Sequence, residues 1–431
     1  MAGLNIVKSV EPIELDNTNE YQIISPTKGQ NLNNCVPFFT SKSSSTGGYI
    51  YRCKPEVYFD DGFIHIKCEL SGTRYVMLYI VEFNPDRVKV QQGHYEMIGT
   101  SSVTIDIEEV DLNKAFLVHN WHTNTSNQSA YIHLIRGYFN NNQQIIFDRG
   151  TTSNNVCGSY WVVESLDNGF TVESNNFSMS GTSATCTFTT TSDVLNRAFC
   201  VYSYRLDDSN TSGTYYYAVR GYLYTATPNL NFNISRLSSG TGVVYAATFL
   251  IVFAEDEGFF AQHNGNVFFG SSIYSLEYNL PVKVNEDFSM VITPSAFCST
   301  TINSSSTSVS EKTFFKCKLK DSGTKVECST VNVSVEARGS YTVVQWPSAD
   351  TYYFSGYITE EGLPVSREVY LFRRDTNDLM DSTTSSGDGY YELYTTYSGL
   401  HYIIAKDDPS DGDEKRYNLA RLDYMTPEVI S

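Results

Sequence analysis

The stretch Asp111-Leu112-Asn113-Lys114-Ala115-Phe116-Leu117-Val118 decides the fold, because the chain repeats it. It returns as Asp193-Val194-Leu195-Asn196-Arg197-Ala198-Phe199-Cys200-Val201. A strand containing an Arg-Gly pair follows each copy, at Arg136-Gly137-Tyr138 and at Arg220-Gly221-Tyr222. Repetition at a period of this length predicts tandem modules built from one supersecondary unit, and it argues against a single catalytic domain.

Two weaker copies flank this pair. One begins at Val36-Pro37-Phe38-Phe39 and the other at Ala296-Phe297-Cys298. When Phe38, Phe116, Phe199 and Phe297 are aligned, the copies follow one another at steps of 78, 83 and 98 residues. The repeat has no natural starting point, so two arrangements stay open: copies that stand as separate beads, and copies that pair strands across their borders.

The segments between these landmarks alternate apolar and polar residues. The alternation is plain over residues 63–70, 102–110 and 330–336, and turns rich in Gly, Asn and Asp separate such segments. A period of two over this length predicts half-buried antiparallel strands. A helical signal occurs only briefly, at 111–114 and 193–197. We therefore predict an all-β protein of tandem antiparallel β-sandwich modules.

The landmarks divide the chain into six parts. Residues 1–34 are polar and Asn-rich, which predicts an N-terminal arm or a first strand that docks elsewhere. In residues 350–431 the strands shorten and Gly and Asp turns become frequent, which predicts a separate C-terminal β-sandwich. Between them lie four β modules, at residues 35–98, 99–180, 181–270 and 271–349.

Composition favours sheets and argues against two kinds of partner. Phe, Tyr and Trp make up 14% of the chain, and such side chains pack well on pleated surfaces. The net charge is −18 and no cluster of Lys and Arg offsets it, so we expect no nucleic acid partner. The first residues lack a secretory signal pattern and no apolar run reaches membrane-spanning length, so we expect cytoplasmic synthesis without membrane insertion.

Nine cysteines are scattered along the chain without a Cys-x-x-Cys pair. In a cytoplasmic chain this pattern is typical of buried free thiols, and disulfides formed later, outside the cell, are the alternative. Zinc is not expected, because paired ligand spacing is absent. The closest histidines, His119 and His122, are three apart on a predicted strand, so they face opposite sides at what we expect to be a surface strand end.

No motif predicts catalysis. The chain has no Gly-x-Ser-x-Gly elbow and no recognisable Cys/His arrangement, so we expect no enzyme activity, no catalytic residue and no cofactor. The segment Asp60-Asp61-Gly62 predicts a hairpin turn. A weak calcium candidate lies in an acidic segment whose spacing differs from that of an EF-hand and which otherwise reads as a solvated loop; its ligands would be Asp407, Asp408, Asp411 and Asp413.

Neighbouring tyrosines are the strongest candidates for contacts. The runs Tyr215-Tyr216-Tyr217 and Tyr390-Tyr391 put rings on both faces of a strand, whereas a sandwich core takes only one face. Tyrosine is favoured at protein interfaces and on sugar-binding surfaces. We therefore take four residues as candidates for a subunit interface or a glycan site: Tyr215, Tyr217, Tyr390 and Tyr391.

Four spaced runs in the C-terminal part follow a fixed order. They are Gly362-Leu363-Pro364, Arg367-Glu368-Val369-Tyr370-Leu371, Gly387-Asp388-Gly389-Tyr390-Tyr391 and Tyr402-Ile403-Ile404-Ala405. This order resembles the transthyretin-like module that is often called carboxypeptidase regulatory-like. The resemblance covers residues 352–424 and implies a small β-sandwich of transthyretin or immunoglobulin-like type.

A second resemblance covers the repeats. It rests on Ile80-Val81-Glu82-Phe83, Val90-Gln91-Gln92-Gly93, the run from Val110 to Phe116, and Arg136-Gly137, in that order. These runs are similar to strings in structural proteins of tailed bacteriophages, which can end in a transthyretin-like module. The phage strings often have Gln-Arg-Gly where this chain has Gln91-Gln92-Gly93, so no role of that Arg is carried over. The resemblance implies a virion protein without specifying its place.

We therefore expect a non-enzymatic structural component of a phage particle, such as a decoration, fibre or collar and tail accessory protein. It would attach to the virion and display its modules. The expected partners are other virion proteins, in a homo-oligomer or in many copies per particle. Two alternatives stay open: a receptor-binding protein that recognises a host surface glycan, and an integral tail or baseplate component.

Overall fold

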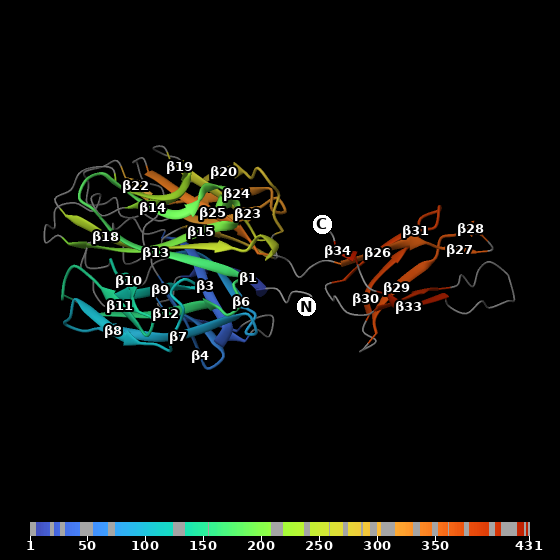
Figure 1. Cartoon of the computed structure of the whole chain (residues 1–431), viewed down its shortest axis with the longest axis horizontal. Coiled ribbons are helices and arrows are strands. Elements are labelled where there is room, and N and C mark those ends of the chain that lie inside the picture. The colour runs from blue at the N-terminus through green and yellow to red at the C-terminus, as the bar shows by residue number, and fades with distance from the viewer. Residues whose placement is uncertain are drawn as a thin grey trace. The chain divides into compact units, whose positions relative to one another are not determined.

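A computed structural model of the chain separates into two compact units, one of residues 6–346 and one that holds the residues from 347 onward (Figure 1). The fold is all-β, as predicted. None of the helices in the described part of the chain has the length and apolar character needed to cross a bilayer. The structure describes residues 6–17, 21–25, 31–43, 55–67, 74–123, 134–153, 155–207, 219–236, 242–257, 259–269, 275–285, 288–293, 300–302, 315–330, 337–346, 352–360, 362–374, 379–395, 401–406, 420–425 and 428–429.

The larger unit holds four copies of one six-strand motif. In each copy the first, sixth and third strands form a long antiparallel sheet, and the second, fifth and fourth strands form a short one. Copy 1 consists of β1 (Val7–Asn17), β2 (Tyr21–Ile24), β3 (Cys35–Ser43), β4 (Glu56–Asp60), β5 (Phe63–Lys67) and β6 (Arg74–Phe83), with a 3-10 helix at Leu32–Asn34. Copy 2 consists of β7 (Val88–Met97), β8 (Ser102–Asp106), β9 (Ala115–Thr123), β10 (Arg136–Asn141), β11 (Gln144–Asp148) and β12 (Val156–Ser165).

Copies 3 and 4 follow the same order. Copy 3 consists of β13 (Phe170–Met179), β14 (Ser183–Thr191), η4 (Ser192–Arg197), β15 (Ala198–Asp207), β16 (Arg220–Ala226), β17 (Asn229–Ser235) and β18 (Val243–Phe253). Copy 4 follows η6 (Glu255–Glu257) and consists of β19 (Phe260–Phe269), β20 (Ser275–Asn279), β21 (Ser289–Ile292), β22 (Thr300–Ile302), β23 (Lys316–Lys320), β24 (Lys325–Ser329) and β25 (Ala337–Gln345). In copy 4, β22 adds a further pairing to β25 of the long sheet.

The central strand of the first long sheet, β6, is apolar on both faces, because each face packs against a different neighbour. In β6, Leu78 and Ile80 pack inside copy 1 against Val57 and Ile66 of its short sheet. The alternate residues of β6, such as Val81, belong to a second core that all four copies share. Burial on both sides replaces the simple inside-and-outside alternation of a lone sandwich.

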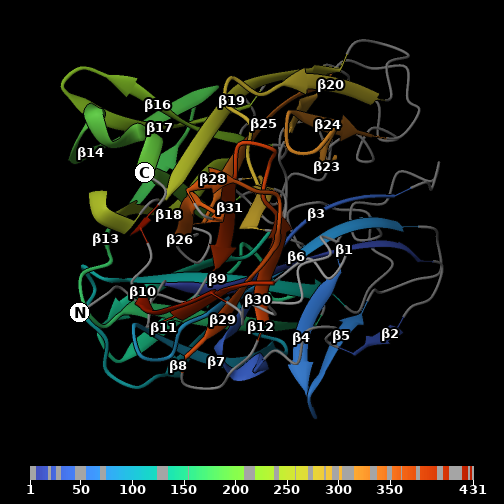
Figure 2. The same ribbon diagram turned by 90° about the vertical axis from the view of Figure 1, so that its right-hand side faces the viewer.

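The four copies surround a common centre. Figure 2 shows copies 1 and 2 in the lower half and copies 3 and 4 in the upper half. Contacts run from β4 to β9, from β10 to β15 and from β16 to β19, joining each copy to the next. They also run from β23 back to β3 and β6, which joins copy 4 to copy 1. We call this closed arrangement the four-copy ring.

Strand register identifies the equivalent residues of the copies. The residue of the third strand that lines up with the shared core is Val36, Phe116, Phe199 and Met290 in turn, at steps of 80, 83 and 91 residues. The alignment of Phe38 with Phe116 was therefore wrong by two residues, because Val36 occupies the position of Phe116. Val36 and Phe38 lie on the same face of β3. The alignment through Phe297 was also wrong, because β21 ends at Ile292; Phe297 itself lies outside the described residues.

The sheets cross the module borders drawn from the sequence. β1 and β2, within the expected arm at residues 1–34, are edge strands of copy 1. The first strands of copies 2, 3 and 4 lie before the expected borders at 98/99, 180/181 and 270/271. Each of them (β7, β13 and β19) nevertheless pairs with the sixth strand of its own copy, which lies beyond that border. In each long sheet the sixth strand lies between the first and the third. The first strand, an edge strand that the expected borders assign to the preceding part, therefore belongs to the same copy. The border at 349/350 lies close to the division after Trp346.

The C-terminal unit is a separate small sandwich. One sheet has the order β31-β26-β34, the other β30-β29-β32-β33, and β27 and β28 form a hairpin. Its core includes Phe354, Val369, Leu371, Leu393 and Ile403. The strands are β26 (Tyr352–Tyr357), β27 (Thr359–Glu360), β28 (Leu363–Pro364), β29 (Glu368–Arg373), β30 (Leu379–Thr384), β31 (Tyr390–Thr395), β32 (His401–Ala405), β33 (Ala420–Met425) and β34 (Glu428–Val429).

Candidate functional site

Three of the four joints between copies are made at one register position. A polar side chain four residues after Phe116 or its equivalent in the third strand bonds to the backbone of the preceding copy's fourth strand. Asn120 accepts a hydrogen bond from the N–H of Val57 at 3.1 Å, and Ser203 accepts one from the N–H of Gly137 at 2.9 Å. At the third joint, Ser340 of the sixth strand donates to the carbonyl of Gly221 instead.

This bond solves a problem of edge strands. The fourth strand is the edge of the short sheet, so part of its backbone has no partner within that sheet. An unpaired backbone group that is buried costs free energy, and an open edge invites wrong pairing. The side-chain side of the bonded fourth-strand residue faces its own copy. At Gly221, an added Cβ would come within 2.5 Å of Phe232 and Tyr202 of that copy. The Arg-Gly pair of the sequence is therefore a joint element.

The joint between copies 1 and 2 adds a buried polar group. Glu56 contacts Nδ1 of His122 at 2.5 Å and accepts a hydrogen bond from Ser159 at 2.8 Å. His119, three residues earlier, is buried in copy 2 with its ring stacked on Trp121. The expectation of a surface strand end was therefore wrong. Glu56, the partner of His122, comes from another copy, which local sequence does not reveal.

The joint between copies 2 and 3 holds one carboxylate between two guanidinium groups. Asp148 accepts hydrogen bonds from Arg136 at 2.6 Å and from Arg205 at 2.9 Å. Both guanidinium groups lie over the ring of Tyr245, at 5.8 and 4.3 Å from its centroid. Because the charged partners differ from joint to joint, each fourth strand fits its own neighbour better than the others.

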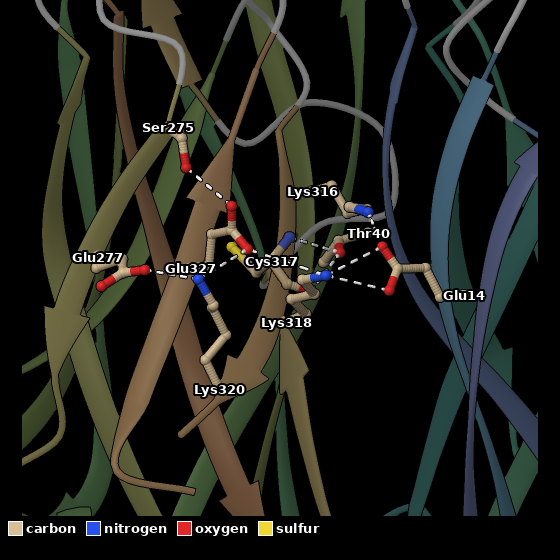
Figure 3. Close-up of polar contacts among 9 residues, drawn as sticks. All are labelled: Glu14, Thr40, Ser275, Glu277, Lys316, Cys317, Lys318, Lys320 and Glu327. Carbon is tan, nitrogen blue, oxygen red and sulfur yellow. Dashed lines mark hydrogen bonds and ion pairs between the residues drawn. The ribbon is translucent and has the colours of Figure 1, made fainter. Parts of the chain in front are cut away.

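The contacts between copies 4 and 1, which we call the closing joint, are shown in Figure 3. The N–H of Cys317 donates to the hydroxyl of Thr40 at 2.9 Å, and this hydroxyl donates to the carbonyl of Cys317 at 3.2 Å. Thr40 lies at the same register position as Asn120 and Ser203. The ring therefore closes with the same kind of bond that joins copy 1 to copy 2 and copy 2 to copy 3.

Lysines of β23 surround this bond. Lys316 and Lys318 both pair with Glu14 of copy 1, the second at 3.1 Å. The hydrogen bond from Lys316 holds the pKa of Glu14 below its ordinary value. Burial, together with the nearby charge of Lys316, lowers the pKa of Lys42, which lies 5.1 Å from the Tyr75 ring centroid. The last residue of β23, Lys320, pairs with Glu277 of β20 at 2.6 Å.

The centre of the ring contains an aromatic cluster. The ring of Trp346 lies 5.7 Å from Phe83, 6.2 Å from Phe199 and 5.4 Å from Phe253, measured between centroids. Phe116 lies 6.2 Å from Phe199. All four copies therefore contribute to one buried aromatic contact network.

The connections between copies converge on Arg87. This residue precedes β7, and it contacts Asp167, before β13, at 2.5 Å and Glu257, before β19, at 2.8 Å. The hydrogen bond to Glu257 raises the pKa of Arg87. Burial alone would raise the pKa of Asp167, but hydrogen bonds from Arg87 and Gly169 lower it. One guanidinium group thus ties three connections together.

A cavity of about 50 Å³ lies between the copies. Its lining includes Phe39, Trp121, Ser203 and Ile292, one from each copy. Pockets that hold metabolites or sugars measure roughly 300–1,000 Å³. This cavity has room for water but not for such a ligand.

The tyrosine candidates have different positions. Tyr391 is 4% exposed and belongs to the core of the C-terminal unit, which corrects its place among the contact candidates. Its neighbour Tyr390 lies on the other face, where its hydroxyl donates to Glu392 at 2.5 Å. This hydrogen bond raises the pKa of the Tyr390 phenol. Beside it, Tyr357 is 66% exposed, with 5.3 Å between the two ring centroids.

Several candidates lie outside the described residues. They are Tyr215, Tyr217, Asp407, Asp408, Asp411 and Asp413, together with Cys53, Cys68 and Cys298. The six described cysteines are free, and all but Cys157 are buried, as expected. Asp61 and Gly62 have φ of 49° and 79° and form the predicted hairpin turn between β4 and β5. Among the described residues, no group of three or more His, Cys, Asp or Glu is placed to hold a metal ion.

Comparisons with known proteins add no relative. No protein-family model matches the chain, and no curated protein matches it.

Proposed function

We propose that the protein is a non-enzymatic structural component of a tailed-phage particle, a decoration, fibre or collar and tail accessory protein. It attaches to the virion and displays its β-sandwich modules. Its partners are other virion proteins, and it is present as a homo-oligomer or in many copies per particle. Multiple copies give useful avidity even where single contacts are weak.

One observation carries this proposal: the runs that resemble phage structural proteins occupy positions that build the ring. Phe116 is part of the central aromatic network, and Gly137 forms the joint to copy 3. Val81 and Val90 occupy equivalent rows of two long sheets. The resemblance therefore concerns the repeated architecture and not an isolated surface motif.

Particle binding tests the proposal directly. Purified protein is incubated with particles that lack it, and the particles are sedimented and imaged. We expect the protein to cosediment and to add a localised density with one ring and one small sandwich per copy. Binding to host cells without binding to particles contradicts the proposal. Insolubility of the isolated chain, with density buried among tail proteins, supports an integral tail or baseplate component instead.

A second candidate, a receptor-binding virion protein, is favoured by the outer face of β26 and β31. Tyr357 and Tyr390 lie opposite each other in the strand register, and Ser355 and Glu392 form the next pair of this kind along the same face. The exposed ring of Tyr357 and the half-buried ring of Tyr390, beside a carboxylate, suit a sugar. The rings can pack on its C–H face, and the carboxylate can accept hydrogen bonds from its hydroxyls.

A glycan array with the full-length protein separates the two candidates. If this face binds a host glycan, Tyr357→Ala abolishes the signal. The matched control is Leu363→Ala, because Leu363 is 69% exposed in the neighbouring hairpin and lies outside the tyrosine pair. An array without signal, or equal signals from both variants, rejects the glycan site and leaves the structural role in place.

A further inference from the structure

Two buried cysteines lie face to face directly behind the closing joint. Cys317 of β23 and Cys328 of β24 are partners in the strand register. Their sulfur atoms are 3.1 Å apart, and both residues are completely buried. The core around them belongs to copy 4 and includes Phe315 and Val326.

The backbone of Cys317 determines what kind of pair this is. Its N–H and its carbonyl both bond to Thr40 of copy 1, so they point away from β24. Cys317 and Cys328 are therefore a non-hydrogen-bonded antiparallel pair, in which the Cα atoms are about 4.5 Å apart. This separation lies within the range of about 4.4–6.8 Å that a disulfide spans. The sulfurs need to approach by only about 1 Å to reach bonding distance.

Two other buried thiols of the described residues have different surroundings. The thiol of Cys35 donates to the backbone carbonyl of Asn31 at 3.3 Å, and that of Cys200 contacts the carbonyl of Val201 at 3.6 Å. These are the ordinary contacts of buried free cysteines. Direct opposition of two sulfurs on neighbouring strands calls for a separate explanation.

We propose that Cys317 and Cys328 are a redox-active pair, which forms a cross-strand disulfide when the protein meets a small-molecule disulfide in an oxidising medium. One thiolate attacks the small disulfide, forms a mixed disulfide and releases one small thiol. The second cysteine displaces the other small thiol and closes the protein disulfide. Two protons and two electrons pass from the cysteines to the small disulfide, which becomes two thiols.

Burial sets when this happens. A thiol without solvent contact reacts only after local opening, so the pair stays reduced in a cytoplasm, where glutathione also maintains thiols. β23 is the edge of its short sheet and the two sulfurs lie in the core of copy 4, so separation of β23 from β24 is the opening that exposes the pair. The chemistry of the pair stands on its geometry alone. The passage from a cytoplasm to an oxidising medium rests on the proposed function.

The disulfide stabilises the closing joint. It fixes β23 to β24 at the residue whose backbone bonds to Thr40. Cross-linking also restricts the unfolded chain, which stabilises the folded state further. Oxidation therefore makes separation of β23 from β24 rarer and keeps β23 in place for its bond to Thr40.

The test uses the reduced full-length protein with oxidised glutathione as the probe. After incubation at a urea concentration just below the unfolding midpoint, the protein is alkylated in denaturant and digested. We expect a peptide pair linked through Cys317 and Cys328, a loss of two alkylation sites, and a midpoint that rises and returns with dithiothreitol. Cys35→Ala, which removes another buried thiol, keeps all three results, and Cys328→Ala loses them.

The peptide map of the wild-type protein decides the outcome even if Cys328→Ala does not fold. Full alkylation of both cysteines after oxidation overturns the proposal. A stable glutathione adduct, or a link from either residue to a different cysteine, overturns it as well. None of these results bears on particle binding, so the two proposals fail independently.

Discussion

The hydroxyl of Thr40 accepts a hydrogen bond from the N–H of Cys317 across 277 residues of sequence. It joins the first copy to the last, in the same way that Ser203 joins copy 3 to copy 2. A chain of tandem modules thereby becomes a closed body, because no copy is left with an unpaired fourth strand at this position. Closure of this kind removes an edge that would otherwise pair with another chain.

The first prediction concerns this bond. Thr40→Val keeps the shape of the side chain but leaves the N–H and carbonyl of Cys317 without a partner. We expect the free energy of unfolding to fall by about 1–3 kcal/mol, the cost of a buried unsatisfied polar group. Urea unfolding measures it, and Thr40→Ser is the control because it keeps the hydroxyl. A valine variant that is as stable as the serine variant contradicts the role of the bond.

The second prediction concerns the charges of the closing joint. The lysines lower the pKa of Glu14, so its ion pairs stabilise the fold at pH above its ordinary pKa, and this contribution is lost as the pH falls through the lower folded value. Because the Glu14 side chain is 47% exposed, we expect Glu14→Gln to cost less than about 1 kcal/mol.

Salt distinguishes this effect from a packing effect. In 1 M NaCl the difference between wild type and Glu14→Gln should disappear, because the screening length falls to about 3 Å. Urea unfolding at low and high salt measures it at neutral pH. A difference that persists in high salt shows that Glu14 acts through contacts other than charge.

The sequence predicts the repeat and its strands better than it predicts the joints. Alternation over residues 102–110 identifies β8, and the echo of residues 111–118 places β15. The alignment through Phe38 failed because residues two apart lie on the same face of a strand, so both choices satisfy the pattern. Only pairing with Val81 selects Val36.

The joint residues were out of reach for a different reason. Glu56 and His122 are 66 positions apart, and neither stands in a motif of its own. The register position of Thr40, Asn120 and Ser203 holds three different residue types, so it leaves no sequence signature. All three side chains can form a hydrogen bond with the backbone of an edge strand. This common role becomes visible only when the copies lie side by side in the fold.

The third prediction concerns Arg87. Arg87→Met leaves Glu257 without its partner, and the Glu257 side chain is only 10% exposed. We expect a loss of about 3 kcal/mol in the free energy of unfolding, since removing one member of a buried ion pair strands the other. The double variant Arg87→Met with Glu257→Met should recover part of this loss, and a double-mutant cycle measures the coupling. Simple additivity contradicts it.

The fourth prediction concerns pH and the joint between copies 3 and 4. Nδ1 of His263 lies 3.0 Å from the hydroxyl of Thr342, and Nε2 lies 3.0 Å from the carbonyl of Leu195 in η4. A carbonyl accepts only, so Nε2 carries a proton. Burial lowers the pKa of His263 to about 4.

The direction in which stability changes with pH follows from proton binding. Between pH 6.5 and 4 the unfolded chain binds a proton at this residue and the folded chain does not, so stability falls as the pH falls through this range. The loss amounts to at most about 3 kcal/mol and is complete near pH 4. Urea unfolding of wild type and His263→Gln at pH 7.5, 5.5 and 4.5 measures it. Groups that titrate alike in wild type and His263→Gln cancel when the stability of one protein is subtracted from that of the other. Stability curves that run parallel over this pH range therefore rule out a neutral His263 at this joint.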